Sequence, residues 1–225
     1  MKKSFLSITF LILTIAGFSN HNHHRDTIQK RLNHGEHPRK IIKSGVPMDS
    51  LYGKKYAGGY IFYFFPKDTS GLVIGTKDLV YPHDTLKGRI IWGCRNINTG
   101  ARETKIGSGQ RNTQKIIDAN CGLWDPEIKK WMKTAAEVCG HYKTHQFDDW
   151  YLPSKDELHE AYMKLCHTPR VNFGKNKEYW TSSEKNDQFA WIEHLEFGHK
   201  EYELHGQSYF RKFYAQYLRP VRTFK

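Results

Sequence analysis

Apolar and polar positions divide the chain into three stretches of different character. Residues 5–17, FLSITFLILTIAG, are mostly apolar, whereas residues 20–55 are polar, basic and interrupted by glycine and proline. From Tyr56 onwards, short apolar runs alternate with turn-forming residues. A segment with few apolar residues cannot bury enough surface to order itself. The pattern therefore predicts an apolar leader over 1–19, a flexible polar linker over 20–55 and one folded domain over 56–225.

Short apolar runs at both ends of this domain predict β-strands, because they are rich in aromatic and β-branched residues and are bounded by turn-forming residues. The predicted strands are YAGGYIFYFFP (56–66), GLVIG (71–75), RIIWGC (89–94), EYWTSS (178–183), FAWIEHLEF (189–197), KEYELHG (200–206) and YLRPVRTF (217–224). A turn over 197–199 is expected to join two of them. Pro220 requires an edge position or an irregular pairing in the last strand.

Helices are predicted in the middle of the domain. Asn112 can cap a helix that begins at Thr113, and WMKTAAEVCG (131–140) is expected to form a second helix that ends at Gly140. Strands first, helices in the middle and strands last are typical of an α+β domain. We therefore expect a mixed, mostly antiparallel sheet with two to three helices.

The stretch DDWYLPSKDEL (148–158) predicts a strand joined directly to a helix over 154–166. Pro153 cannot continue a strand ladder and biases the preceding residue toward extended geometry. Ser154 and Glu157 have the spacing of a capping box, in which each side chain accepts from the backbone of the other residue. This junction packs a helix against a sheet, and its pattern does not require a catalytic role.

The N-terminus has the pattern of a signal peptide. Lys2 and Lys3 precede an apolar run that is too short to span a bilayer comfortably, and Gly17 and Ser19 supply small residues for cleavage near Ser19. An uncleaved anchor is the alternative, and it would be the chain's only link to a membrane. The predicted location is therefore the periplasm, the cell surface or the medium, where a protein meets little nucleic acid.

The charge of the chain favours a polyanionic partner. The 225 residues carry a formal net charge of +12, with a pI of about 9.4. Such a field attracts nucleic acid, anionic membrane surfaces and acidic or sulfated glycans, and charge alone does not choose among them. The predicted export makes nucleic acid the least favoured of the three.

The cysteine count agrees with an oxidising compartment. Cys94, Cys121, Cys139 and Cys166 can form two disulfides in three ways. Pairing of sequence neighbours, Cys94 with Cys121 and Cys139 with Cys166, is our expectation, and reduced buried thiols are the alternative. The chain contains no Cys-x-x-Cys pair, so neither a zinc knuckle nor a thioredoxin-like redox site is expected.

Four motifs, taken in order, resemble the Lcl C-terminal domain family, which is named for a bacterial collagen-like adhesin. They are IGSGQRNT (106–113), DWYLPS (149–154) with Glu157 and Leu158, YWTSSE (179–184) and RPVR (219–222). The similarity extends from about Gly58 to the end of the chain. The residues that carry it with a structural role are Trp150, Leu152, Pro153, Ser154, Glu157, Trp180, Arg219 and Arg222. We expect Arg222 to pair with Glu184 or Asp149.

The resemblance implies a fold akin to C-type lectins and formylglycine-generating enzymes, in which the first and last strands pair. Here that pairing would place residues 60–65 beside residues 218–224. It also implies a role in surface adhesion that includes binding of sulfated glycosaminoglycans. The chain lacks the Gly-X-Y collagen segment of the adhesin, so avidity through a collagen trimer is not implied.

A set of basic residues is the candidate site for an anionic polymer. Arginine forks match sulfate and carboxylate geometry, and lysines add point charges. The candidates are Arg95, Arg102, Lys105, Arg111, Lys115, Lys129, Lys130 and Lys133. The alternative is a solvated basic surface that only keeps the protein soluble.

Two groups of residues can be drawn as metal sites, and we expect neither to be one. Five histidines, His21, His23, His24, His34 and His37, have irregular spacing in the predicted linker. The oxygen ligands Glu184, Asn186 and Asp187 lack the Glu-Pro-Asn motif of calcium-dependent sugar binders, and we expect them to form a turn. No metal and no cofactor is therefore predicted.

An enzymatic reading has less support in the residues. His141 and His145 lie near Asp148 and Asp149, but no positioned nucleophile accompanies them. A catalyst like the formylglycine-generating enzymes would need a reactive cysteine pair. The sequence therefore predicts an exported, non-enzymatic module that binds anionic polysaccharide. A protein-binding or structural module of the cell envelope is the main alternative.

Overall fold

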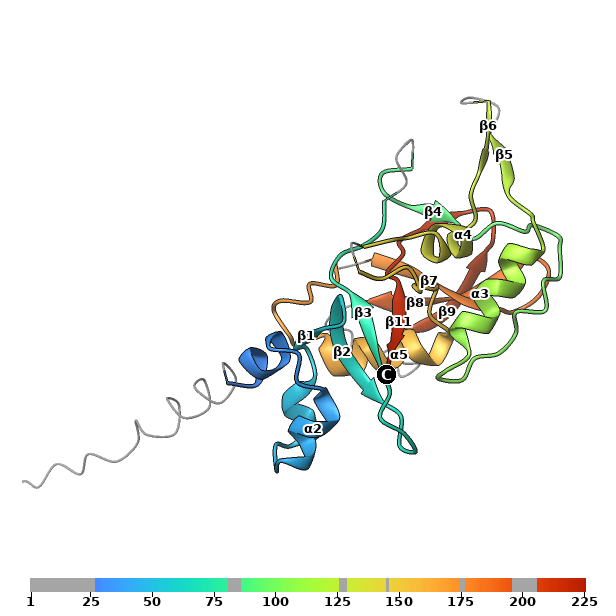
Figure 1. Cartoon of the computed structure of the whole chain (residues 1–225). Helices are drawn as coiled ribbons and strands as arrows, with labels where there is room; N and C mark the ends of the chain where they lie inside the picture. The colour runs from blue at the N-terminus through green and yellow to red at the C-terminus, as the bar shows by residue number, and fades with distance from the viewer. Residues whose placement is uncertain (1–26, 81–85, 126–128, 145, 175–176, 196–205) are drawn as a thin grey trace, which may run out of the picture. The chain divides into compact units, whose positions relative to one another are not determined.

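The computed structural model describes residues 27–80, 86–125, 129–144, 146–174, 177–195 and 206–225 (Figure 1). The chain divides into two compact units, with the boundary between Ser50 and Leu51. The predicted leader lies outside the described residues, so its cleavage stays a prediction. No helix within the described ranges is long and apolar enough to cross a membrane.

The first unit is helical where the sequence analysis expects a flexible linker. Residues 27–33 are helical, and α2 (Pro38–Lys43) begins after His37, whose Nδ1 accepts from the backbone N–H of Arg39 at 3.2 Å. A 3-10 helix, η1 (Met48–Leu51), ends at the boundary. The difference has a local cause, because a proline at the first helical position and a polar residue before it favour helix initiation.

The first sheet of the second unit is antiparallel and has the order β1-β2-β3-β11. Its strands are β1 (Lys55–Tyr56), β2 (Gly59–Phe64), β3 (Gly71–Gly75) and β11 (Val221–Phe224). The expectation that the first and last strands pair is wrong, because β3 lies between β2 and β11. The short β2–β3 connection places β3 on one edge of β2, and β1 occupies the other edge.

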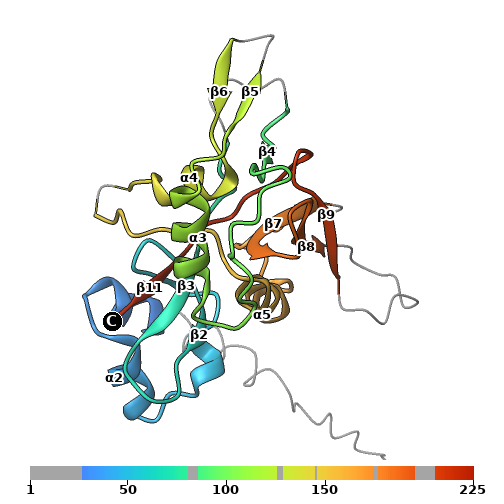
Figure 2. The same cartoon turned by 90° about the vertical axis from the view of Figure 1, so that its right-hand side faces the viewer.

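The second sheet is also antiparallel and has the order β7-β8-β9 (Figure 2). It contains β7 (Lys177–Glu184), β8 (Phe189–Leu195) and β9 (Gln207–Arg211). The predicted strand at 200–206 and the turn at 197–199 fall almost entirely outside the described residues. Two pairs of short strands complete the unit: β4 (Ile90–Ile91) with β10 (Ala215–Gln216), and β5 (Leu123–Asp125) with β6 (Lys130–Met132).

Three α-helices lie within the described part of the second unit: α3 (Gly109–Asp118), α4 (Ala135–Gly140) and α5 (Lys155–Leu165). The unit therefore mixes α-helices with antiparallel sheets, as the sequence analysis predicts at this coarse level. Two predicted helix starts are wrong. Ser108 rather than Asn112 precedes α3, and α4 begins after Thr134 rather than at Trp131. A capping box between Thr134 and Glu137 sets the start of α4.

The predicted junction at Pro153 is present as a capping box. Ser154 Oγ accepts from the backbone N–H of Glu157 at 3.3 Å, and the Glu157 carboxylate accepts from the backbone N–H of Ser154 at 2.7 Å. Just before it, Tyr151 and Val221 exchange two backbone hydrogen bonds of 2.9 Å. The junction therefore connects α5 to the end of the first sheet.

Two hydrophobic clusters form the core on which these elements pack. One surrounds Trp92, Leu152 and Trp180, and the other surrounds Phe62 and Leu158. Trp180 donates from Nε1 to the carbonyl of Ile90 at 2.9 Å, so its polar atom is satisfied although the residue is fully buried. Large aromatic residues of this kind contribute most of the buried apolar area.

One of the two expected disulfides is present. Cys94 and Cys121 are bonded, whereas Cys139 and Cys166 are free thiols, so the second predicted pair is wrong. Cys139 is buried in α4 within the cluster around Trp92, and Cys166 lies half-buried at the C-terminal end of α5. Burial raises the pKa of both thiols, and the shift is larger for Cys139.

We predict that the two free thiols differ in reactivity because the thiolate is the reactive form. A thiol-specific reagent under native conditions should modify Cys166 slowly and Cys139 only after unfolding, as measured by mass spectrometry of peptides. The Cys166→Ala variant should lose the native reaction, and Cys139→Ala should retain it. Equal native labelling of both residues would contradict the described burial.

We predict unequal effects from the two capping boxes. The Glu137 carboxylate accepts from the N–H of Thr134, whereas the fully buried Glu157 accepts from the backbone N–H groups of both Ser154 and Gly107 at 2.7 and 2.8 Å. Glu157→Ala should lower the free energy of unfolding by about 3 kcal/mol or more, because buried donors lose their acceptor. Glu137→Ala should cost about 1 kcal/mol. Chemical denaturation measures both, and similar losses would refute the difference.

Candidate anion-binding surface

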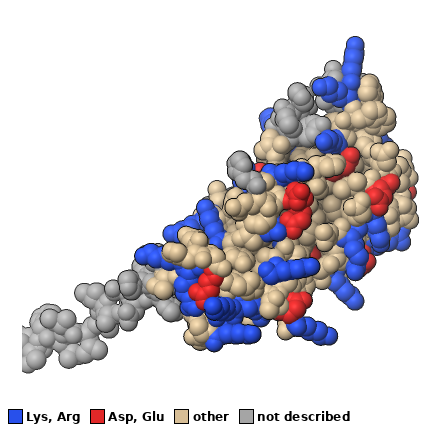
Figure 3. Space-filling view, viewed as in Figure 1, with Lys and Arg blue, Asp and Glu red and all other residues tan. Residues whose placement is uncertain are grey.

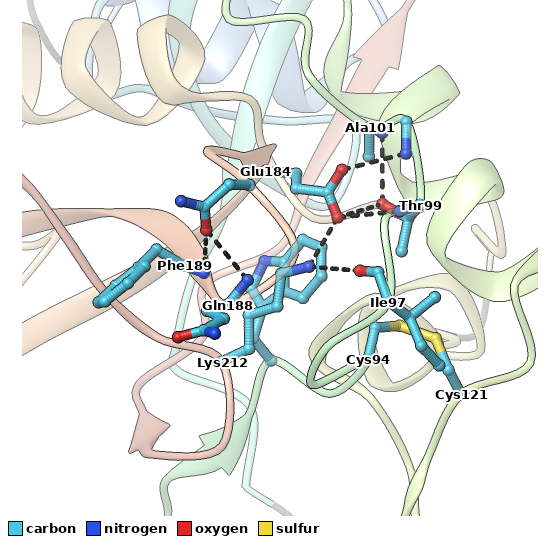
Figure 4. A network of polar contacts seen from close by, with 12 residues as sticks. Cys94, Ile97, Thr99, Ala101, Cys121, Glu184, Gln188, Phe189 and Lys212 are labelled. Carbon is cyan, nitrogen blue, oxygen red and sulfur yellow. Dashed lines mark hydrogen bonds and ion pairs between the residues drawn. A yellow bond between two sulfur atoms is a disulfide. The ribbon is translucent and has the colours of Figure 1, made fainter.

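The irregular segment that links Cys94 to α3 is held by two buried glutamates. Glu184 accepts from the backbone N–H groups of Thr99 and Gly100 at 2.9 and 3.0 Å (Figure 4). Glu157 accepts from the N–H of Gly107 at the other end of the segment. Because buried backbone groups need partners, these carboxylates fix the path of a segment that forms no helix or strand.

Glu184 also forms a fully buried ion pair with Lys212. Lys212 Nζ lies 2.6 Å from Glu184 Oε1, donates to the carbonyl of Ile97 at 2.9 Å and sits 4.5 Å from the centroid of the Trp92 ring. Burial lowers the pKa of Lys212, and the hydrogen bond that Lys212 donates to Glu184 opposes that shift. The carboxylate oxygens are occupied by protein donors, so the pair serves the structure and not a ligand.

Arg222 has one of the two partners predicted for it. Arg222 pairs with Asp149, with Nε–Oδ1 and Nη2–Oδ2 distances of 2.6 and 3.0 Å, and Glu184 is left to Lys212. Arg219 is buried and bonds Asp78 and the carbonyl of Val171. Arg222 therefore connects a separate loop to β11, and Arg219 connects other loops to the residues just before β11.

The three residues weighed as calcium ligands lie at the β7–β8 turn. Asn186 Oδ1 accepts from the backbone N–H groups of Gln188 and Phe189, at 3.0 and 2.8 Å, which closes the turn. Within the described residues, no three His, Cys, Asp or Glu side chains are grouped so that they could hold a metal ion. His21, His23 and His24 of the predicted linker lie outside those residues.

Both aspartates of the set considered for acid–base chemistry have basic partners outside the set. Asp148 lies 3.8 Å from Lys143, and Asp149 is bound by Arg222. His141 is exposed at the end of α4, and His145 lies outside the described residues.

The structure divides the eight predicted basic residues into two groups. Five lie on α3 or on the segment before it, and Lys129, Lys130 and Lys133 lie on or beside β6. Figure 2 shows the β5–β6 hairpin projecting beyond α4, whereas the segment before α3 runs beside β7. On the face seen in Figure 3, lysine and arginine side chains are interspersed with acidic ones.

Most of the first group already has contacts within the protein. Arg111 pairs with Glu103 at 2.5 Å, and Arg102 lies 3.9 Å from Glu184. Lys115 donates to the carbonyl of Gly100, and the Arg95 guanidinium lies over the Phe213 ring. Lys105 is exposed. These residues carry positive charge, but several are partly neutralised or positioned by the protein itself.

A row of aromatic side chains lies on one face of β8 and β9, where Phe189 and Trp191 are half-buried and Tyr209 is exposed. Along β8, Phe189 and Trp191 alternate with the buried Ala190 and Ile192, as the two-residue period of a strand requires. Tyr209 on β9 is directly opposite Trp191, and their ring centroids are 5.9 Å apart. The Phe189 and Tyr209 rings are 5.5 Å apart.

Three cations lie over these rings. Lys155 Nζ is 4.5 Å from the Trp191 centroid, Lys185 Nζ is 3.2 Å from the Tyr209 centroid, and Arg211 Cζ is 5.8 Å from that of Phe189. None of these cations forms an ion pair with a carboxylate in the part of the chain that the structure describes. We call the set the basic–aromatic face; it consists of Lys155, Lys185, Phe189, Trp191, Tyr209 and Arg211.

The segment before α3 borders this face. Ser154 Oγ donates to the carbonyl of Lys105 at 2.9 Å, and the N–H of Glu184 donates to that of Ala101 at 2.8 Å. Ser154 and Glu184 immediately precede Lys155 and Lys185. The predicted residues Arg102 and Lys105 therefore lie on a segment that is bonded to the start of α5 and to the end of β7, next to two cations of the basic–aromatic face.

An acid–base pair of a half-buried histidine and a buried glutamate lies next to the face. His159 Nδ1 on α5 is 3.0 Å from Glu193 Oε1 on β8, and Glu193 is fully buried. The hydrogen bond that His159 donates to Glu193 raises the pKa of His159, and burial raises the pKa of Glu193. The pair connects α5 to β8 two positions after Trp191, so it holds the helix that carries Lys155.

The basic–aromatic face was not predicted from the sequence, although the alternation that sets apart its two β8 aromatic residues can be read there. The alternation in FAWIEHL separates Phe189 and Trp191 from the core positions. The pairing of β9 with β8 is not local, however, and Lys155 and Lys185 lie at a helix start and a strand end.

Comparison with known proteins adds no family and no relative. A scan against protein-family models finds no match, and a search of curated proteins finds no similar sequence. The resemblance to the Lcl C-terminal domain family stays a prediction.

We predict that the His159–Glu193 pair makes stability depend on pH. A raised pKa in the folded state contributes stability below the unfolded value, which is about 6.5 for histidine, and that stability is lost as pH rises through the folded pKa. The raised pKa of Glu193 acts in the same direction. The free energy of unfolding should therefore fall as pH is increased above about 6.5. Denaturation across a pH series measures it, and an unchanged slope in His159→Gln or Glu193→Gln would contradict this origin.

Proposed function

We propose that this protein is an exported, non-enzymatic module that binds anionic polysaccharide through the basic–aromatic face. The observation that carries the proposal is the row formed by Phe189, Trp191 and Tyr209, with a cation over each ring and no carboxylate paired to these cations among the described residues. Aromatic rings offer flat apolar surfaces, and lysine and arginine bind sulfate or carboxylate groups. A chain of acidic sugars presents apolar ring faces, which can contact aromatic rings, and anionic groups, which can bind lysine and arginine.

The contacts of the unbound face fit such a ligand. Exposed cation–π contacts contribute only about 0.5–1 kcal/mol each, so an anionic polymer can take up the ammonium groups and leave the rings as platforms. The buried core beneath the face, with Ala190 and Ile192 inside, holds the rings in place. A rigid platform loses little conformational entropy when it binds.

The proposal includes export and a C-type-lectin-like architecture. The Cys94–Cys121 disulfide supports an oxidising compartment. Two antiparallel sheets, with the first and last strands of the unit in one sheet, support the architecture in its coarse features. The direct pairing of terminal strands expected from the resemblance is not part of the proposal, because β3 separates β2 from β11.

We predict that two charge-matched variants differ in binding to heparin, a sulfated polysaccharide. Lys155→Ala/Lys185→Ala/Arg211→Ala removes three cations from the basic–aromatic face, and Lys129→Ala/Lys130→Ala/Lys133→Ala removes three from the hairpin. The face variant should bind at least about tenfold more weakly, since charge-assisted contacts contribute on the order of 1 kcal/mol or more each. The hairpin variant should keep most of its affinity.

Titration calorimetry at several salt concentrations measures both affinities. Binding of the parent should weaken as salt rises, because exposed charges are screened within about 10 Å at 0.1 M. Equal losses in the two variants would show a diffuse charge effect and overturn the assigned surface. No binding of the parent to heparin, with salt-tolerant binding to an envelope protein, would favour the protein-binding alternative.

A further inference from the structure

The β5–β6 hairpin exposes two tryptophans outside the basic–aromatic face. Trp124 and Trp131 are directly opposite in the strand register, with ring centroids 5.9 Å apart in an edge-to-face arrangement. They are 47% and 67% exposed, although tryptophan is among the side chains that gain most from burial. Figures 1 and 2 both show the hairpin projecting from the rest of the second unit. This position makes the two tryptophans accessible to a binding partner.

Lysines flank the exposed tryptophan of β6. Lys129 and Lys133 lie just outside the two ends of β6, two positions before and after Trp131, and both are exposed. Lys130 lies within β6, opposite Asp125 in the register. The segment 123–133 contains three lysines and two carboxylate residues. The exposed tryptophans are therefore accompanied by exposed cations on the same hairpin.

The base of the hairpin is fixed on both sides. Cys121, two residues before β5, is bonded to Cys94, and its carbonyl accepts from the N–H of Cys94 at 2.8 Å. Thr134, two residues after β6, caps α4. A two-stranded hairpin alone is marginally stable, so these attachments make it a defined structure that presents its tryptophans.

We propose that the β5–β6 hairpin is a contact site for an anionic membrane surface. Tryptophan has an apolar ring and a polar N–H, and it is enriched where apolar and aqueous phases meet. Lysines near such a surface gain about 1 kcal/mol each from anionic headgroups, or about fivefold in partitioning. The two rings meet edge to face, and insertion into a headgroup layer requires no common ring plane.

The test uses the exported form predicted from the sequence, which begins at Asn20, so that the apolar leader does not bind lipid. Partitioning is measured by co-sedimentation with phosphatidylcholine vesicles that contain or lack phosphatidylglycerol. The parent should bind the anionic vesicles at least tenfold more strongly, and its tryptophan emission should shift to shorter wavelength. Equal binding to neutral vesicles, or no binding, would overturn the proposal.

Variants assign the binding to the hairpin. Trp124→Ala/Trp131→Ala should reduce partitioning by tenfold or more, and Lys129→Ala/Lys133→Ala by roughly 25-fold, at fivefold for each lysine. Trp124→Phe/Trp131→Phe keeps an aromatic pair and should bind with intermediate strength. Circular dichroism confirms that each variant is folded. Unchanged partitioning in folded alanine variants would refute the site.

The control is Tyr209→Ala, which removes a similarly exposed aromatic residue from the basic–aromatic face. It should leave vesicle binding unchanged and weaken heparin binding. Loss of heparin binding in the tryptophan variants, with vesicle binding retained, would assign the hairpin to polysaccharide and overturn the membrane proposal. Vesicle binding without any heparin binding would sustain the membrane proposal and contradict the proposed function.

Discussion

Two buried carboxylates set the path of the segment between Cys94 and α3, and the arrangement of the second unit depends on that path. Glu184 binds the backbone at Thr99 and Gly100, and Glu157 binds it at Gly107. The segment has no ladder or helix of its own to satisfy these groups, and an unpaired buried N–H group would cost about 1–3 kcal/mol. Once fixed, the segment lies along the ends of β7 and α5, where Lys155 and Lys185 begin the basic–aromatic face.

The Lys212–Glu184 pair contributes more to positioning the segment before α3 than to the free energy of unfolding. A fully buried ion pair loses much of its Coulomb energy to desolvation, so its net effect on the free energy of unfolding is small when both partners are present. Removal of one partner leaves a buried charge, and this asymmetry favours a single arrangement. Lys212 also donates to the carbonyl of Ile97, so the pair and the Cys94–Cys121 disulfide together hold the start of the segment that leads to α3.

Local features of this fold could be predicted from the sequence, and long-range pairings could not. The capping box of Ser154 and Glu157 involves residues three positions apart, and Pro153 fixes where the strand ends. The first disulfide was predicted correctly, but Cys139 packs in the core beside Trp92 and leaves Cys166 without a partner within bonding distance. The placement of β3 beside β11 and the pairing of Glu184 with Lys212 depend on contacts between distant segments, which alternation and propensity do not encode.

The candidate site shows the same division. Charge and predicted export favour an acidic polymer already at the level of the sequence. Of the predicted cations, Arg102 and Lys105 are exposed and lie on the segment bonded to Ser154 and Glu184, and their role in binding stays a prediction. The aromatic row requires β8 to lie beside β9, so it becomes visible only in the folded protein. Lys129, Lys130 and Lys133 were grouped with the other cations by sequence proximity, but they belong to a separate hairpin.

Hydrogen–deuterium exchange with and without a heparin fragment tests the central claim most directly. The account predicts slower exchange of backbone amides over 185–193 and 207–211 when the fragment is bound, with little change over 123–133. Protection confined to the hairpin, or distributed evenly over the basic residues of the chain, would contradict the assignment of anionic polysaccharide to the face formed by β8 and β9.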